Sequence, residues 1–161
     1  MPAERLTIEP ATRGDIEVLL GIQRAAAVTA FAHIFPPDRY PFPSAEIRDL
    51  WADALDDPEV ETYLGLAGDE PAGLVSIGHG MLRRLFVAPE RQGTGVGSEL
   101  HDFGLTRLVA LGESEARLWT LEGNASGRRF YERRGWVESG TTRVVPYPPR
   151  PLDVEYRRAL P

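Results

Sequence analysis

The sequence predicts an α/β or α+β domain with a mixed, largely antiparallel sheet of six to seven strands and about four helices. Three observations predict this class. Short segments that alternate apolar and polar residues recur along the chain, as in strands buried on one face. In other segments apolar residues recur at intervals of three and four residues, as in amphipathic helices. Between residues 60 and 87, three strand-like segments follow one another without a helix, which favours antiparallel pairing.

The first third of the chain is predicted to hold one strand and two helices. Residues 6–9 alternate like a short strand. Thr12 and Asp15 match a capping box with a shortened acid, ahead of a helix that runs to about residue 32. Four prolines between residues 33 and 43 forbid a helix there. Ser44 is predicted to cap the second helix, which ends near residue 57.

The rest of the chain is predicted to alternate strands and helices, separated by glycine and proline turns. The predicted strands are 60–67, 72–77, 81–87, 116–121, 136–145 and 153–158, and the predicted helices are 96–111 and 124–134. We see no repeat or linker, so residues 1–161 are predicted to form one domain.

Composition excludes several classes of site. The chain has no cysteine, which excludes disulfides, thiolate metal sites and a cysteine nucleophile. The three histidines match no metal-ligand spacing, so we expect no metal. The N-terminus lacks the apolar stretch of a signal peptide, and no apolar run approaches the roughly 20 residues of a membrane span. We therefore expect a soluble cytoplasmic protein that does not bind a membrane.

The charge is divided unevenly along the chain. Residues 1–82 carry a net charge of −9 and residues 83–161 a net charge of +3. This division suits an enzyme that binds a cation with one half and a polyanion with the other, although two solvated surfaces can differ this way by chance. No basic stripe favours nucleic-acid binding. All 18 basic residues are arginine, which excludes a Walker P-loop because that motif needs lysine.

The segment 85–100 carries the strongest functional signal. A predicted strand leads into a turn with glycines at positions 93, 95 and 97, and the turn leads into a helix. Such a turn exposes backbone N–H groups at a helix start, where phosphate or pyrophosphate binds well. The glycine spacing does not match the Rossmann fingerprint. A plain tight turn is the alternative interpretation.

A second segment, 118–136, joins a predicted strand to a short helix at Asn124. Asn124 is a favourable N-cap, and Tyr131 lies two helical turns later on roughly the same face. Taken alone, this pattern is more often that of an ordinary cap and a half-buried aromatic residue.

Together the two segments resemble the GNAT (Gcn5-related N-acetyltransferase) superfamily. The first matches its acyl-CoA motif as Gln92-Gly93-Thr94-Gly95-Val96-Gly97, and the second matches its Asn…Phe-Tyr…Gly-aromatic pattern as Asn124, Phe130-Tyr131 and Gly135-Trp136. The strong match covers about residues 72–137. The resemblance implies a GNAT-like fold, with a sheet splayed between the strands that end near Val87 and Leu121.

The resemblance also implies a single acyl-CoA N-acyltransferase domain that moves an acetyl group from acetyl-CoA to a primary amine of a small molecule or peptide. It implies that backbone groups of three strand residues pair with the pantetheine arm, that the amides of the turn hold the pyrophosphate, and that Asn124 bonds the pantetheine. The implied CoA-binding residues are Leu85, Phe86, Val87, Gln92, Gly93, Thr94, Gly95, Val96, Gly97, Ser98 and Asn124. Tyr131 is expected near the sulfur, where it donates to the leaving thiolate.

The general base is open on sequence grounds. Members of this family often carry a glutamate early in the strand before the glycine turn, but here that stretch is Met81-Leu82-Arg83-Arg84. His79 is the first candidate because histidine titrates near neutral pH, and Glu122 is the second. For both, a role in an ordinary turn or at the surface is the alternative. The missing carboxylate also favours a second function, a non-catalytic acyl-CoA binding or sensing domain.

The acceptor site is expected between His33 and Phe42, where aromatic residues lie among prolines. The acidic first half favours a cationic acceptor. These aromatics can equally cover the core. A phosphate-binding domain unrelated to CoA is a third functional alternative, and a homodimer is compatible with the resemblance.

Overall fold

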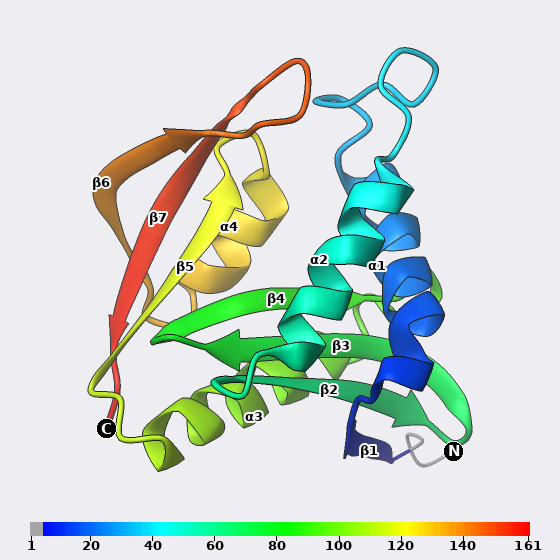
Figure 1. Cartoon of the computed structure of the whole chain (residues 1–161). Helices are drawn as coiled ribbons and strands as arrows, with labels where there is room; N and C mark the ends of the chain where they lie inside the picture. Colours follow the sequence, from blue (N-terminus) through cyan, green and yellow to red (C-terminus); the bar gives the residue numbers. More distant parts are fainter. Residues whose placement is uncertain (1–4) are drawn as a thin grey trace.

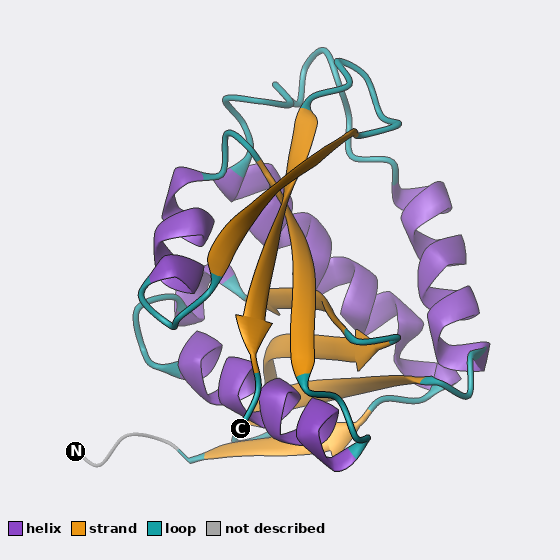
Figure 2. Ribbon diagram, turned by 90° about the vertical axis from the view of Figure 1, so that its left-hand side faces the viewer, coloured by secondary structure: helices purple, strands orange, loops and turns teal. Residues whose placement is uncertain are grey.

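The protein, described by a computed structural model over residues 5–161, is a seven-stranded sheet with helices on both sides (Figures 1 and 2). Residues 1–4 of the predicted single domain lie outside the described part. The strands are β1 (Leu6–Pro10), β2 (Val60–Ala67), β3 (Glu70–Gly78), β4 (Met81–Val87), β5 (Glu115–Leu121), β6 (Val137–Val144) and β7 (Leu152–Ala159). The α-helices are α1 (Ile16–Ala30), α2 (Ser44–Asp56), α3 (Val96–Ala110) and α4 (Ala125–Glu132).

The sheet is mixed, as the sequence predicts, with the strand order β1-β2-β3-β4-β5-β7-β6. Strands β1 to β4 form an antiparallel half, and β5, β7 and β6 form a second antiparallel half. Only β4 and β5 run parallel. The glycine turn follows β4 and the Asn124 turn follows β5, so parallel pairing brings both turns to the same edge of the sheet.

The two halves of the sheet meet at one end of β4 and then separate. Met81 pairs with Arg117, and the Arg117 amide donates to the Gly80 carbonyl over 3.0 Å. Beyond this point β4 and β5 diverge toward Val87 and Leu121 (Figure 1). The predicted splay is confirmed. It leaves backbone groups of both strands without a partner strand, so another extended molecule has room to pair with them.

The helices cover two faces of the first half-sheet and create two cores. Helix α3 packs Leu100 and Leu108, both fully buried, against one face together with residues of β5 and β7. Helices α1 and α2 pack Leu19 and Trp51 against the other face. Helix α4 lies beside β5, and its Tyr131 contacts the α3-side core. No helix within residues 5–161 is long and apolar enough to cross a bilayer.

Of the caps predicted for α1 and α2, the structure confirms the first and not the second. The Thr12–Asp15 capping box is confirmed, since the Asp15 carboxylate accepts the Thr12 N–H over 2.8 Å. Ser44 as the cap of α2 is wrong. Ser44 is the first helical residue, and Pro43 occupies the cap position without a side-chain hydrogen bond. Proline is compatible with this position because it has no N–H to satisfy.

Candidate active site

A cleft of about 620 Å³ opens where β4 and β5 separate. Its walls come from Leu85, Phe86 and Val87 of β4, from Trp119 to Leu121 of β5, and from α1, the glycine turn and α4. All three β4 residues that the sequence predicts to contact pantetheine therefore line it. The cleft lies at the ends of β4 and β5, the only parallel pair among the strands of residues 5–161, and ligands of open α/β sheets bind at that kind of position.

The glycine turn forms one end of the cleft. Gly93 and Gly95 have φ angles of 75° and 91°, and Gly95 is the N-cap of α3. A Cβ atom at either position would meet nothing within 4 Å, so glycine serves the left-handed backbone and not the available space. The start of α3 borders the cleft, and the unpaired N–H groups of a helix start are the donors that an anion site requires.

Most residues of the predicted pyrophosphate motif border the cleft. Gln92, Gly93, Gly95, Gly97 and Ser98 line it. The side chains of Thr94 and Val96 do not: the Thr94 hydroxyl donates to the Arg91 carbonyl, and Val96 is buried in the α3-side core. Their side chains take no part in the cleft lining, so a ligand in the cleft would meet their backbone groups.

Asn124 links the two elements on the opposite wall. Its Oδ1 accepts the Gly127 N–H over 3.1 Å, which caps α4, and its Nδ2 donates to Thr120 Oγ1 over 3.1 Å. The predicted cap is confirmed. The carboxamide lines the cleft and retains one N–H that can donate to a ligand.

Tyr131 lies on the cleft wall one α4 turn beyond Gly127. Its ring packs edge-on against Phe130 and Trp136, at centroid distances of 5.3 and 6.0 Å. Burial raises the pKa of Tyr131 above its ordinary value, while the nearby Arg134 opposes the rise. The phenol is therefore protonated at neutral pH and able to donate a hydrogen bond.

Arg134 is a cleft residue that the sequence did not indicate. Its guanidinium stacks over Phe130, 3.6 Å from the ring centroid, and donates to the Phe130 carbonyl and to the Ser98 hydroxyl in the first turn of α3. It thus puts a positive charge beside the predicted pyrophosphate site. No sequence signal separates Arg134 from its neighbour Arg133, because the difference comes from the way α4 packs against α3.

Neither base candidate lines the cleft. His79 lies in the turn before β4, with φ of 54°, and its ring contacts Asp57 at 2.9 Å and Glu59 at 3.3 Å. It is at the joined end of β4 and β5, away from the splay. Glu122 follows β5, and its carbonyl accepts a hydrogen bond from Arg128 while its side chain is exposed. The cleft walls offer no glutamate.

The expected aromatic acceptor pocket is not formed by the residues predicted for it. Phe35, Tyr40 and Phe42 do not line the cleft, and Phe42 packs against the core beneath α1 and α2. Phe42 therefore has the alternative role that the sequence left open, which is to cover the core. Phe31, at the end of α1, lines the cleft instead. His33, in the loop after α1, contacts the Gly123 carbonyl after β5 at 2.9 Å.

Comparison with protein families supports the resemblance seen in the sequence. The model of the acetyltransferase (GNAT) family matches residues 27–136, which include β4, the glycine turn, α3, β5 and α4. None of the curated proteins compared with the chain matches it in sequence.

Solved structures share the fold over almost the whole chain. The PaiA N-acetyltransferase of Thermoplasma acidophilum, in complex with coenzyme A, has a TM-score of 0.75 at 17% identity and covers 96% of this chain and 99% of its own. A GCN5-related N-acetyltransferase of Rhodopseudomonas palustris has a TM-score of 0.76 at 20% identity over 99% of both chains. A spermidine N-acetyltransferase chimera from Vibrio cholerae and hSSAT has a TM-score of 0.70 at 18% identity, covering 96% of this chain and 95% of its own. At these identities the likeness establishes the fold.

Proposed function

Because the chain belongs to the acetyltransferase (GNAT) family, we propose that it transfers the acetyl group of acetyl-CoA to a primary amine of a small molecule or peptide. One observation carries the proposal. The cleft between the separating strands has the glycine turn and the start of α3 at one end and a protonated tyrosine on its wall. Coenzyme A needs both features, since it is a pyrophosphate joined by a pantetheine arm to a reactive thioester.

The donor would lie along the cleft. Backbone groups of Leu85, Phe86 and Val87 would pair with the pantetheine amides as an added strand does. The N–H groups from Gln92 to Ser98 would hold the pyrophosphate, and Asn124 would donate its remaining N–H to the pantetheine arm. This arrangement is supported by the open edge of β4 and by the positive φ angles of the turn.

The reaction is direct. The neutral amine attacks the thioester carbon, the C–S bond breaks to release the CoA thiolate, and the amine proton passes to solvent water as the amide forms. The chain has no cysteine to carry the acetyl group, so no acyl-enzyme on sulfur is available. A strand N–H, such as that of Val87, would stabilise the charge that develops on the carbonyl oxygen.

Tyr131 acts on the leaving group. A thiol has a pKa of about 8.5 and an ordinary tyrosine one of about 10, so complete proton transfer to the thiolate is already unfavourable. Burial raises the Tyr131 pKa further and increases this mismatch. We therefore infer that Tyr131 stabilises the thiolate as a hydrogen-bond donor and that solvent completes the protonation.

The experiment is release of the CoA thiol from acetyl-CoA in the presence of a broad amine panel that includes N-terminal peptides. We expect Tyr131→Phe, which removes the hydrogen bond to the leaving thiolate, to lower kcat about 10- to 100-fold with an unchanged Kd for CoA. Tyr40→Phe, a tyrosine outside the cleft lining, is the matched control and should keep full activity. Acetyl-CoA binding without any amine-dependent thiol release would favour the non-catalytic sensing domain. CoA failing to raise the Tm while another nucleotide does would point to an unrelated phosphate-binding protein.

A further inference from the structure

A β-bulge in β4 places Arg83 and Arg84 on the same side of the sheet. Arg84 pairs with Ser76 of β3, but the next pair joins Ile77 to Leu82, so Arg83 has no partner of its own. In a regular strand, consecutive side chains point to opposite faces, and one extra residue breaks that alternation. Leu82 and Leu85 accordingly both contact the α3-side core. The two arginines between them both face α2.

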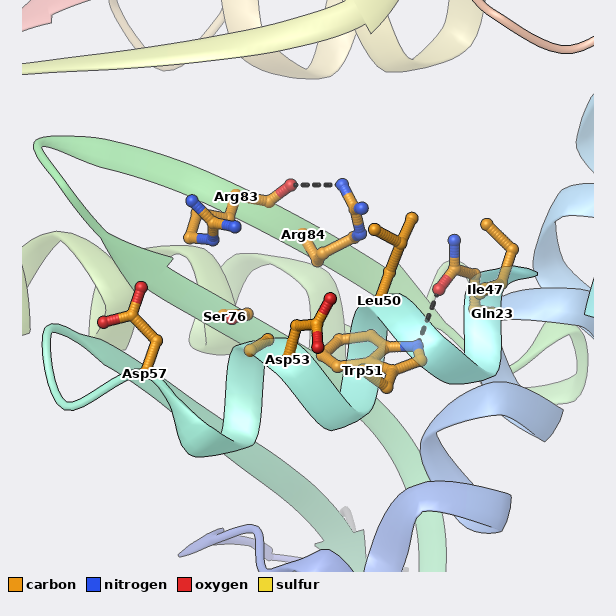
Figure 3. A pocket seen from close by; sticks show the side chains of 10 residues that line it. Gln23, Ile47, Leu50, Trp51, Asp53, Asp57, Ser76, Arg83 and Arg84 are labelled. Carbon is orange, nitrogen blue, oxygen red and sulfur yellow. Dashed lines mark hydrogen bonds between the residues drawn. The ribbon is translucent and has the colours of Figure 1, made fainter. Parts of the chain in front are cut away.

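These two arginines line a second, smaller cavity of about 120 Å³ between α2 and the strands β3 and β4 (Figure 3). They also line the large cleft, so the two spaces meet at the β4 bulge. Gln23 of α1 borders the small cavity as well. Its Oε1 accepts the Trp51 indole N–H over 2.8 Å, which leaves the Gln23 amide nitrogen as a donor for a ligand (Figure 3).

Neither guanidinium forms an ion pair within the described residues. Arg84 donates to the Arg83 carbonyl over 3.2 Å. The carboxylates nearby have other partners: Asp57 contacts His79 at 2.9 Å, and Asp153 contacts Arg143 at 3.0 Å. Asp53, which also borders the cavity, is exposed and forms no ion pair with either arginine.

The local electrostatics favour an anion at this point. Burial lowers the pKa of Arg84 most, and the neighbouring positive charge of Arg83 lowers it further, while Tyr147 and Asp153 partly oppose the shift. Two adjacent positive charges in a partly desolvated wall are unfavourable unless an anion compensates them. A planar guanidinium binds a carboxylate with two parallel hydrogen bonds.

The phosphates of CoA are not that anion. Arg84 precedes Val87 by three residues, about 10 Å along a strand, and the glycine turn begins beyond Val87. In the proposed donor orientation the pyrophosphate lies at the turn, and the thioester lies near Tyr131 and the middle of β4. Arg83 and Arg84 therefore belong to the acyl end of the cleft, where the acceptor must arrive.

We propose that the acceptor carries a carboxylate as well as its amine, and that Arg84 and Arg83 bind this carboxylate at the β4 bulge. The proposal rests on the acetyltransferase function proposed above. It identifies the substrate class as a small amino carboxylate, which is a zwitterion in solution. It also changes the expectation of a purely cationic acceptor, because the positive amine would be recognised together with a negative group.

The first test compares matched acceptors in the acetyl-CoA assay. Amino acids and short peptides are paired with their carboxamides and with the corresponding decarboxylated amines. We expect kcat/KM for the carboxylates to exceed that for the matched neutral-tail amines by at least about tenfold, the value of one charge-assisted hydrogen bond. Arg84→Met should reduce this ratio toward one without changing the KM for acetyl-CoA. Arg84→Lys keeps the positive charge but loses the planar guanidinium. Its ratio of kcat/KM values should lie between those of the wild type and Arg84→Met.

Arg24→Gln removes an exposed charge on α1 outside both cavities and should leave the ratio unchanged. Arg83→Gln provides a second variant if Arg84→Met unfolds, which a thermal melt reports. Equal use of carboxylates and amides by the wild-type protein, or a ratio that Arg84→Met does not alter, would overturn the proposal. Preference for phosphoethanolamine over every carboxylate would also overturn it.

A binding measurement separates this proposal from the reaction itself. N-acetyl amino acids and their N-methylamides are titrated into the CoA-loaded protein, with wild type and Arg84→Met compared by calorimetry. The expected result is tighter binding of the carboxylates by at least about tenfold in the wild type alone. If no amine is acetylated but this preference remains, the catalytic function fails and the carboxylate site stands. If amines are acetylated and no preference exists, the carboxylate site fails and the catalytic function stands.

Discussion

Gly127 lies so close to Asn124 that no side chain fits between them: a Cβ atom on Gly127 would be 2.2 Å from Asn124 Nδ2. Gly127 also donates the N–H that Asn124 accepts at the start of α4. The carboxamide therefore holds its place in the cleft wall only while residue 127 has no side chain. The structure explains a glycine that lies inside a helix, where glycine is otherwise unfavourable.

Gly127→Ala is predicted to displace Asn124, to give no net gain in stability and to weaken CoA binding. Loss of the cap costs about 1 kcal/mol, which offsets the gain of about 0.5–1 kcal/mol from the better helix propensity of alanine, so the free energy of unfolding should change little. The loss of Asn124 from the wall should raise the Kd for CoA. Denaturant melts and calorimetric titration measure the two effects.

Gly21→Ala is the matched control for this variant. Gly21 lies inside α1, and a Cβ there would meet nothing within 4 Å. Alanine at this position should raise the free energy of unfolding by about 0.5–1 kcal/mol and leave CoA binding unchanged. Equal effects of the two substitutions would contradict the steric role of Gly127.

The sequence predicted the parts of the molecule that depend on local patterns. Strand-like segments bounded by turn residues located β2 and β4, and the glycine spacing located the turn at the start of α3. The resemblance then supplied the splay between β4 and β5, which no local pattern contains. The same local signals failed at Ser44, where a good capping residue follows a proline that takes the cap position.

The parts of the candidate site that sequence could not supply depend on packing. The stretch Met81 to Leu85 has no feature that marks a bulge, yet the bulge at Arg83 determines which face Arg84 occupies. Arg134 and Arg133 are adjacent and chemically identical, and only the contact with the start of α3 distinguishes them. His79 has suitable chemistry for a base, but the chain holds it at the closed end of the splay.

Arg134→Gln is predicted to weaken CoA binding through the pyrophosphate. Removing one charge beside the turn should raise the Kd for CoA about 10- to 100-fold, as for a lost charge-assisted hydrogen bond. Turnover of acetyl-pantetheine, which lacks the pyrophosphate, should change little. Arg133→Gln is the control, because Arg133 is exposed and does not line the cleft. An equal loss with both thioesters would show that Arg134 acts on the shape of α4 instead.

The pH dependence of turnover is predicted to lack a falling limb from Tyr131 below about pH 10, the ordinary tyrosine pKa. Burial raises the Tyr131 pKa, so its protonated, donating form persists to higher pH than in a free tyrosine. The rate should instead rise with pH as the acceptor amine loses its proton. Steady-state kcat measured from pH 6 to about 10, in wild type and Tyr131→Phe, checks this. A decline that starts near pH 8 in wild type and is absent in the variant would contradict it.

The free energy of unfolding is predicted to fall as the pH is lowered below about 6.5, the ordinary histidine pKa, because of His101. The Trp136 indole donates to His101 Nε2 over 2.9 Å, so the neutral ring carries its proton on Nδ1 and directs it to Asp102 at 2.9 Å. Burial lowers the pKa of His101, and the Asp102 contact only partly opposes this. Below its ordinary pKa the unfolded chain therefore binds one proton more than the folded chain, and acid favours unfolding by up to about 1.4 kcal/mol per pH unit.

His101→Gln should flatten this slope, since its amide oxygen can still accept the Trp136 N–H but the side chain does not titrate. The carboxylates of Asp57 and Glu61, whose pKa values are lowered by hydrogen bonds from His79 and Arg107, lose their stabilising contribution in a more acidic window, below about pH 4.5. Urea melts between about pH 5 and 7.5 therefore avoid the carboxylate window, and the difference in slope between wild type and His101→Gln isolates the contribution of His101. An unchanged slope in His101→Gln would assign the acid sensitivity to another group.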